Sequence, residues 1–118
     1  MAGKLLTALV LLLVTADASA GFYLDGNQLH AKLTASKKMQ GGTPSLSDLG
    51  EAQNALGYIN GVADTLNGTV VCAPNEVTDG QLVAVVSKYV DEHPEQWQVQ
   101  ANLLVGRALH QAFPCPSK

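Results

Sequence analysis

Charged and aromatic residues are scarce in this sequence. Charged residues make up 14% and aromatic residues 5% of its 118 residues, with a single tryptophan. Because ordinary globular chains carry about 25% charged residues, the low fraction predicts a partly apolar surface that meets a partner. The net charge is −3. The lack of a basic excess speaks against a nucleic-acid partner, which requires a basic stripe.

Long apolar runs are also scarce, and the most prominent one lies near the start of the chain, at residues 5–14. It is shorter than the roughly 20 residues that span a bilayer. Lys4 precedes it and the small residues Ala18 and Ala20 follow it, an order typical of a cleaved export signal. We therefore expect a signal peptide at residues 1–20, cleaved after Ala20, and one domain at residues 21–118 with no membrane insertion after cleavage. A retained N-terminal anchor is the alternative.

Cysteine is limited to two residues, Cys72 and Cys115. An even count behind an export signal predicts one disulfide in an oxidising compartment. The ring of about 44 residues would stabilise the fold by about 4 kcal/mol in chain-entropy terms. The alternative is a free catalytic thiol paired with a histidine. Because no nucleophile turn and no zinc-type spacing accompanies these residues, we expect no enzyme activity, no catalytic residue, no cofactor and no metal.

Residues 46–67 have the pattern of a long amphipathic helix, because apolar residues recur in steps of three and four. The expected buried face consists of Leu49, Ala52, Leu56, Ile59, Ala63 and Leu66. Ser45, three residues before Asp48, is the expected N-cap. Gly57 and Gly61 lie one turn apart inside this helix, where a glycine costs about 1 kcal/mol relative to alanine. We therefore expect them to form a flat strip against the backbone of a neighbouring helix.

Three further helices are expected. The first starts near Asp25 and ends at Lys38, the next is opened by the capping box that begins at Thr78, and the last runs from Pro94 to Ala112. The prediction is an all-α fold, a small orthogonal bundle of about four helices stapled by one disulfide. The sequence alone allows two interpretations for each of three side chains. Tyr58 and Trp97 are core residues or binding anchors, and Asp64 bonds a helix terminus or is a solvated carboxylate.

Several stretches resemble the Rap1a/Tai family of immunity proteins. They are LGYINGVAD at residues 56–64, VCAP at 71–74, VTDGQLVAVVSKYVDEHPE at 77–95 and ALHQAFPC at 108–115. The structural motif in the first stretch comprises Gly57, Tyr58, Gly61 and Asp64. The resemblance implies an all-helical periplasmic protein that binds and occludes a secreted peptidoglycan amidase effector of the type VI secretion system. It also implies a homodimer, as in amidase-inhibiting members.

The sequence departs from the family in one informative way. An earlier cysteine pair that is common in the family falls here on Leu33 and Ala55. Because both positions carry apolar residues, we expect them to pack the first helix against the long one without a covalent bond. The resemblance thus leaves Cys72 and Cys115 as the remaining pair.

Under this resemblance, the contact surface is expected at two helix junctions, residues 75–79 and 93–97. The residues expected to contact the partner are Asn75, Glu76, Thr78, Asp79, His93, Glu95 and Trp97. Carboxylates at such junctions steer association and fix register more than they add affinity. Two ordinary solvent-facing junctions are the alternative.

Two other classes of function suit a small exported helical chain. A periplasmic acid-stress chaperone would open near pH ~2–3, where carboxylates become protonated. The scarcity of carboxylates and the lack of charged tails make this class the weaker choice. A structural or envelope-assembly protein is the other class, and no specific feature of the sequence favours it.

Overall fold

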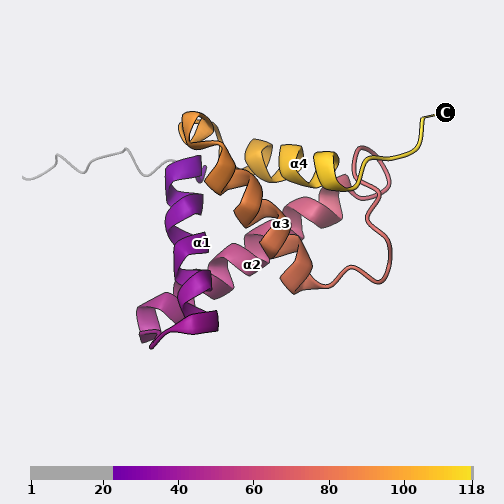
Figure 1. Cartoon of the computed structure of the whole chain (residues 1–118). Coiled ribbons are helices and arrows are strands. Elements are labelled where there is room, and N and C mark those ends of the chain that lie inside the picture. Colours follow the sequence, from indigo (N-terminus) through magenta and orange to yellow (C-terminus); the bar gives the residue numbers. More distant parts are fainter. Residues whose placement is uncertain (1–22, 118) are drawn as a thin grey trace, which may run out of the picture.

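The computed structural model describes residues 23–117, which form four α-helices and one short 3₁₀ helix (Figure 1). The elements are α1 (Gly26–Gly41), α2 (Leu46–Leu66), α3 (Asp79–Glu92), η1 (Pro94–Gln96) and α4 (Ala101–Ala112). This part of the chain contains no strand, only isolated β-bridges. The expected all-α fold with four main helices and one disulfide is confirmed. Among these residues, none of the helices is long and apolar enough to cross a membrane. The expected signal peptide at residues 1–20 lies outside the described residues.

The first three helices each begin at a reciprocal capping box. Asp25 caps α1, Ser45 caps α2 and Thr78 caps α3, and in each case the third residue of the helix bonds back to the cap. This arrangement satisfies two of the N–H groups that a helix start leaves without a partner. Local sequence therefore determines where these three helices begin.

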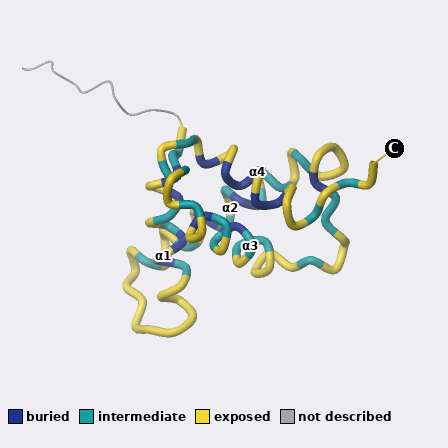
Figure 2. Tube along the Cα trace, turned by 45° about the horizontal axis from the view of Figure 1, so that its top comes forward, coloured by how far each residue is buried: buried dark blue, intermediate teal, exposed yellow. Residues whose placement is uncertain are grey.

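The core lies where the four helices meet, and Figure 2 shows the buried segments gathered there. It consists of Leu29, Leu33, Ala55, Ile59, Val71, Val86, Val90, Ala101, Val105, Ala108 and Leu109. Leu33 is 1% exposed and Ala55 is fully buried. These apolar residues thus lie in one core shared by α1 and α2, as expected from the loss of the earlier cysteine pair.

The first two turns of α2 are not part of this core. Leu46 is 88% and Leu49 40% exposed, so the expected buried face of α2 is wrong at its N-terminal end. The fully buried residues of α2 are Ala55 and Ile59. Periodicity marks one side of a helix as apolar, but it does not indicate how far along the helix its neighbours extend.

The expected start of the last helix is also wrong. Pro94 opens the short η1 helix, and α4 begins only at Ala101. The backbone between them bonds to the start of α1 instead of continuing as a helix. The N–H of Gly26 donates to the carbonyl of Val99, and the N–H of Ala101 donates to the carbonyl of Leu24. A long-range contact has therefore replaced the helical bonds that the local pattern favours.

Candidate partner-binding surfaces

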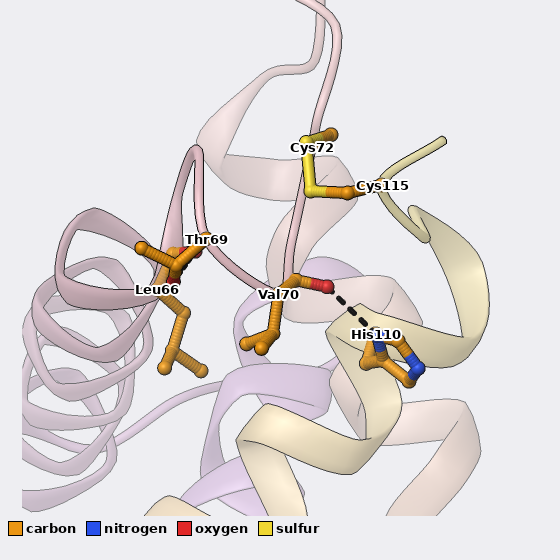
Figure 3. Close-up of a disulfide and its surroundings, with 6 residues drawn as sticks. All are labelled: Leu66, Thr69, Val70, Cys72, His110 and Cys115. Atoms are coloured by element: carbon orange, nitrogen blue, oxygen red, sulfur yellow. Dashed lines mark hydrogen bonds between the residues drawn. A yellow bond between two sulfur atoms is a disulfide. The ribbon is translucent and has the colours of Figure 1, made fainter. Parts of the chain in front are cut away.

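The segment between α2 and α3 is fixed to the end of α4. Cys72 and Cys115 form the expected disulfide, with their Cα atoms 4.8 Å apart (Figure 3). The N–H of Cys72 donates to the carbonyl of Phe113 over 2.8 Å, and Val71 and Pro114 form an antiparallel bridge. This attachment sets the position of the loop that carries the first expected contact segment.

His110 of α4 adds a second attachment. Its Nδ1 lies 2.7 Å from the carbonyl oxygen of Val70, also drawn in Figure 3. Because a carbonyl only accepts hydrogen bonds, Nδ1 carries the hydrogen and donates it to this carbonyl.

Two residues before Val70 in the same loop, Gly68 has φ +82°, a conformation that favours glycine. Its N–H donates to the carbonyl of Val71, so the loop is shaped by its own backbone bonds.

A polar cleft of about 380 Å³ opens between α2, this loop and the start of α3. Its polar lining consists of Asn60, Asp64, Asn67, Asn75 and Asp79. The Oδ1 atom of Asn60 is buried and accepts no hydrogen bond from any described residue. The structure therefore brings Asp64 of the sequence motif together with Asn75 and Asp79 of the expected contact segment.

The acidic residues around this cleft differ from most others in the fold. Elsewhere, Glu51, Asp48, Asp91 and Glu92 each pair with a lysine. By contrast, no residue of the described chain forms an ion pair with Asp64, Glu76 or Asp79. Glu76 and Asp79 are exposed, as is Asp64. The cleft thus presents negative charge that is not neutralised within the described chain.

Thr78, by contrast, uses its side chain within the fold. Its Oγ1 accepts a hydrogen bond from the N–H of Gln81 as the cap of α3. Although Thr78 is exposed, its substitution would change the start of α3 as well as any contact with a partner.

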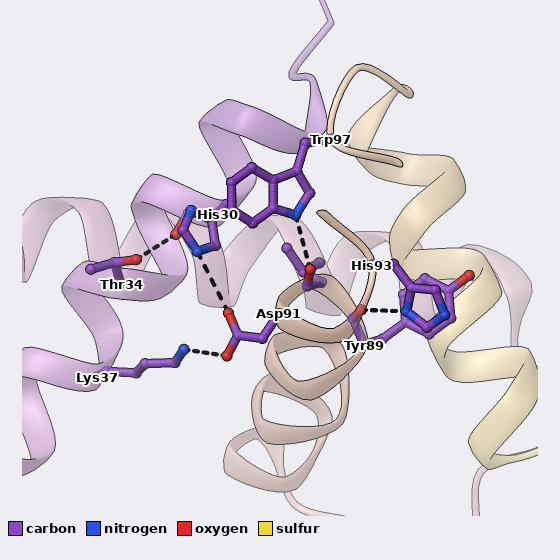
Figure 4. Close-up of polar contacts among 8 residues, drawn as sticks. His30, Thr34, Lys37, Tyr89, Asp91, His93 and Trp97 are labelled. Carbon is purple, nitrogen blue, oxygen red and sulfur yellow. Dashed lines mark hydrogen bonds and ion pairs between the residues drawn. The ribbon is translucent and has the colours of Figure 1, made fainter. Parts of the chain in front are cut away.

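The second expected contact segment, residues 93–97, is largely occupied by internal contacts (Figure 4). The indole N–H of Trp97 donates to the carbonyl of Val90 over 2.9 Å, and its ring stacks on His30 with centroids 3.9 Å apart. His93 stacks on Tyr89 at 4.1 Å, and its Nδ1 lies 2.7 Å from the Tyr89 carbonyl. Only partly exposed surfaces of Trp97 and His93 remain for a partner.

Glu95 differs from its neighbours because it is exposed and forms no ion pair with a described residue. It is therefore the residue of this turn whose charge is free to meet a partner.

The two expected segments lie at opposite ends of α3. This helix has 14 residues, and at 1.5 Å per residue its ends are about 21 Å apart. The structure therefore does not combine the two segments into one compact site. The loop at residues 75–79 and the turn at residues 93–97 are separate surfaces.

Sequence reasoning missed the polar network that holds α1 against α3, which Figure 4 also shows. Asp91 pairs with Lys37, and its other oxygen lies 3.6 Å from Nε2 of His30. Since these residues are 54 or more positions apart in sequence, no local spacing could have revealed the contact. The ring of His30 thus lies between a carboxylate and Trp97.

The structure also contains an apolar groove of about 720 Å³ between α2 and α4, which the sequence did not predict. It is lined by Tyr23, Leu24, Gly57, Tyr58, Gly61, Val62, Thr65, Leu66, Asn102, Leu103, Gly106, Arg107 and His110. Tyr23 is 73% and Leu103 47% exposed. Burial raises the pKa of the Tyr58 phenol above its ordinary 10.0, an effect that the backbone N–H of Asn102 opposes.

The glycine strip of α2 forms part of this groove, and the expected neighbouring helix is not there. A Cβ atom built on Gly57 or Gly61 would meet no atom of the described chain within 4 Å. Tyr58, beside them, is half-buried against the core. The sequence signal for the groove was present in the spacing of the two glycines, but periodicity does not indicate which molecule approaches them.

Free thiols and clusters of metal-ligating side chains are not found among the described residues. Neither cysteine is a free thiol, and residues 23–117 contain no group of three or more His, Cys, Asp or Glu side chains that could hold a metal ion. What the arrangement offers is a rigid loop, a negatively charged cleft and an apolar groove, features suited to binding another protein.

Comparison with known proteins adds a specific finding. The sequence model of the family described as Rap1a immunity proteins matches residues 25–115. No curated protein matches the chain. The matched range spans all four helices and both cysteines.

Proposed function

Because this chain belongs to the family of Rap1a immunity proteins, we propose that it is a periplasmic immunity protein that binds and occludes a secreted peptidoglycan amidase of the type VI secretion system. The observation that carries the proposal is the family match over residues 25–115. The proposal includes export by a signal peptide that is cleaved after Ala20. It also holds that the protein is not an enzyme and blocks its target by covering the substrate groove.

The loop before α3 is the contact surface that we propose for the effector. It carries Asn75 and Asp79 into the polar cleft and is fixed by the Cys72–Cys115 bond. A loop held in this way loses little conformational freedom on binding, which favours affinity. The uncompensated carboxylates Asp64, Glu76 and Asp79 suit basic side chains at the rim of an enzyme groove.

The proposal can be tested by inhibition. The mature protein, residues 21–118, is mixed with each secreted peptidoglycan amidase encoded in the same genome, and cleavage of purified peptidoglycan is measured. We expect cleavage by one amidase to stop near equimolar protein. Full cleavage by every amidase at a large excess of the protein would contradict the proposal.

The contact surface is tested with matched variants. We expect Asp64→Asn combined with Asp79→Asn to weaken binding of the inhibited amidase by about tenfold or more, the equivalent of about 1.4 kcal/mol. Glu51→Gln is the control, because Glu51 is a carboxylate of α2 that pairs with Lys32 and lies outside the cleft. Equal weakening by both changes would locate the effector elsewhere.

We also propose that the inhibitor acts as a homodimer, a proposal that rests on membership of the Rap1a family and on the dimer that the sequence resemblance implies. Sedimentation equilibrium of the mature protein at micromolar concentration should give twice the mass of one chain. A single-chain mass over the whole concentration range would exclude the dimer without affecting the inhibition test.

A further inference from the structure

Among the lysines and arginine of the described chain, Arg107 alone has no carboxylate partner, and it lines the groove between α2 and α4. The described lysines, Lys32, Lys37, Lys38 and Lys88, each lie within ion-pair distance of an Asp or Glu. Arg107 instead donates one hydrogen bond, over 2.9 Å, to the neutral Oε1 of Gln96. A guanidinium has five N–H donors in a planar fork. Those not used by Gln96 suit a carboxylate, which arginine binds in a two-pronged contact.

The shape of the groove indicates the kind of segment that fits it. It follows α2 from Gly57 to Leu66 and α4 from Asn102 to His110, which is about 13 Å at 1.5 Å per residue. This length corresponds to between two and three turns of an α-helix. The open floor at Gly57 and Gly61 allows a helix to approach closely, and a helix laid into an apolar groove is a common mode of recognition.

The rim of the groove supplies the residue types that anchor protein contacts. Tyr23 and Leu103 are exposed apolar side chains at the groove, and Tyr58 is half-buried beside them. Tyrosine and arginine are enriched at the residues that contribute most to binding energy. An apolar surface of this kind on a single chain marks an interaction site.

Charge argues against a second copy of this chain as the occupant. None of the residues that line the groove is an aspartate or glutamate. In a two-fold symmetric interface each surface meets itself. Two copies joined through this groove would therefore bury Arg107 twice with no lining carboxylate to pair it, and an unpaired buried charge is costly.

We propose that this groove is a second interaction surface, which binds a helix of a different protein that places one carboxylate beside a row of apolar side chains. The apolar row lies on the glycine floor, and the carboxylate pairs with Arg107. This surface is separate from the acidic cleft, so one chain can hold two binding partners or two parts of one partner. The proposal does not depend on inhibition of an amidase.

The test uses the mature protein and three labelled peptides of 18 residues. Each peptide is an amphipathic helix with leucines along one face, and the three differ in one residue beside the leucines, which is glutamate, glutamine or lysine. Binding is measured by fluorescence anisotropy. We expect the glutamate peptide to bind about tenfold or more tightly than the lysine peptide.

Two variants with matched controls test the assignment. Arg107→Glu should reverse the preference, so that the lysine peptide binds more tightly, whereas Lys88→Glu on α3 should leave it unchanged. Gly61→Leu should weaken all three peptides about tenfold or more. Gly50→Leu is its control, because Gly50 lies on the same helix, is equally open and is not part of the groove.

Three results would overturn the proposal. One is failure of all three peptides to bind, and another is equal binding of the glutamate and lysine peptides. The third is a dimer of the mature protein that Gly61→Leu dissociates and Gly50→Leu does not, which would assign the groove to self-association. Circular dichroism of each variant establishes that it has retained its helices before these results are interpreted.

Discussion

At the scale of single residues, Trp97 shows how an expected binding anchor can be used inside the fold. Its indole N–H reaches the carbonyl of Val90 on α3, and its ring stacks on His30 of α1. Its own carbonyl accepts hydrogen bonds from the backbone and side chain of Asn27. One residue therefore connects the turn after α3 to two helices.

We expect Trp97→Phe to lower the free energy of unfolding by about 1 kcal/mol, because it removes the hydrogen bond to Val90 and keeps an aromatic ring. Urea denaturation at pH 7 measures the change. The neighbouring Glu95→Ala is the control and should change stability by less than about 0.5 kcal/mol, since Glu95 is exposed and unpaired among the described residues. Equal effects of the two changes would refute the role given to the indole N–H.

At the scale of elements, the start of α2 carries a titratable cap. The N–H and the hydroxyl of Ser45 both donate to the carboxylate of Asp48 over 3.0 Å. These hydrogen bonds, the backbone one first, hold the pKa of Asp48 below its ordinary 3.8, and Lys38 adds to the effect. Because the pKa is lower in the folded state, the contribution of Asp48 to stability is complete above the unfolded value. It is lost as the pH falls through the folded value.

This sign gives a pH-dependent prediction. At pH 7, Asp48→Asn should be less stable than the natural chain, and the difference should shrink as the pH falls below about 4, where the carboxyl group becomes protonated. Urea denaturation at pH 7, 5, 4 and 3 follows the difference. Gln81→Ala removes the corresponding neutral side chain from the cap of α3, and its effect should not depend on pH. A constant difference for Asp48→Asn would show that its charge has no part in the cap.

Glycines in different helices give opposite predictions. Gly57→Ala and Gly61→Ala should each raise the free energy of unfolding by about 0.5–1 kcal/mol, since a Cβ there meets no described atom and alanine is the better helix former. In α1, a Cβ on Gly26 would lie 2.6 Å from the carbonyl oxygen of Trp97. Gly26→Ala should therefore destabilise the fold by about 1–3 kcal/mol. Thermal and urea denaturation measure all three, and a loss of stability in the α2 variants would mean that the strip is covered within the chain.

At the scale of the whole molecule, features that depend on local sequence were predicted better than features that depend on long-range contacts. The capping boxes at Ser45 and Thr78 are short patterns, so the starts of α2 and α3 followed from the sequence. The break before Ala101 did not, because it depends on bonds to the start of α1, which is far away in the chain. Asn75 and Asp79 were expected as contact residues of a helix junction, but the sequence did not predict that they line a cleft together with Asp64. The apolar groove between α2 and α4 was not predicted. The spacing of Gly57 and Gly61 indicates an open strip on α2, but it does not indicate what lies against that strip.

The disulfide acts at the same scale, because it joins the loop after α2 to the end of the described chain. We expect Cys72→Ser combined with Cys115→Ser to lower the free energy of unfolding by about 2–5 kcal/mol. Urea denaturation with and without a reductant measures this loss. Reductant should bring the natural chain to the stability of the double variant and leave the variant itself unchanged. Insensitivity of the natural chain would mean that the bond does not contribute to stability.

The positions of the two ends of the described chain have a practical consequence. Tyr23 lines the groove, and Cys115 is bonded to Cys72, which lies between two residues of the cleft, Val71 and Ala73. An affinity tag or fluorescent protein attached directly next to Tyr23 or Cys115 would therefore stand beside one of the two proposed binding surfaces. A label attached at Leu46, which is 88% exposed and belongs to neither surface, leaves both accessible for interaction measurements.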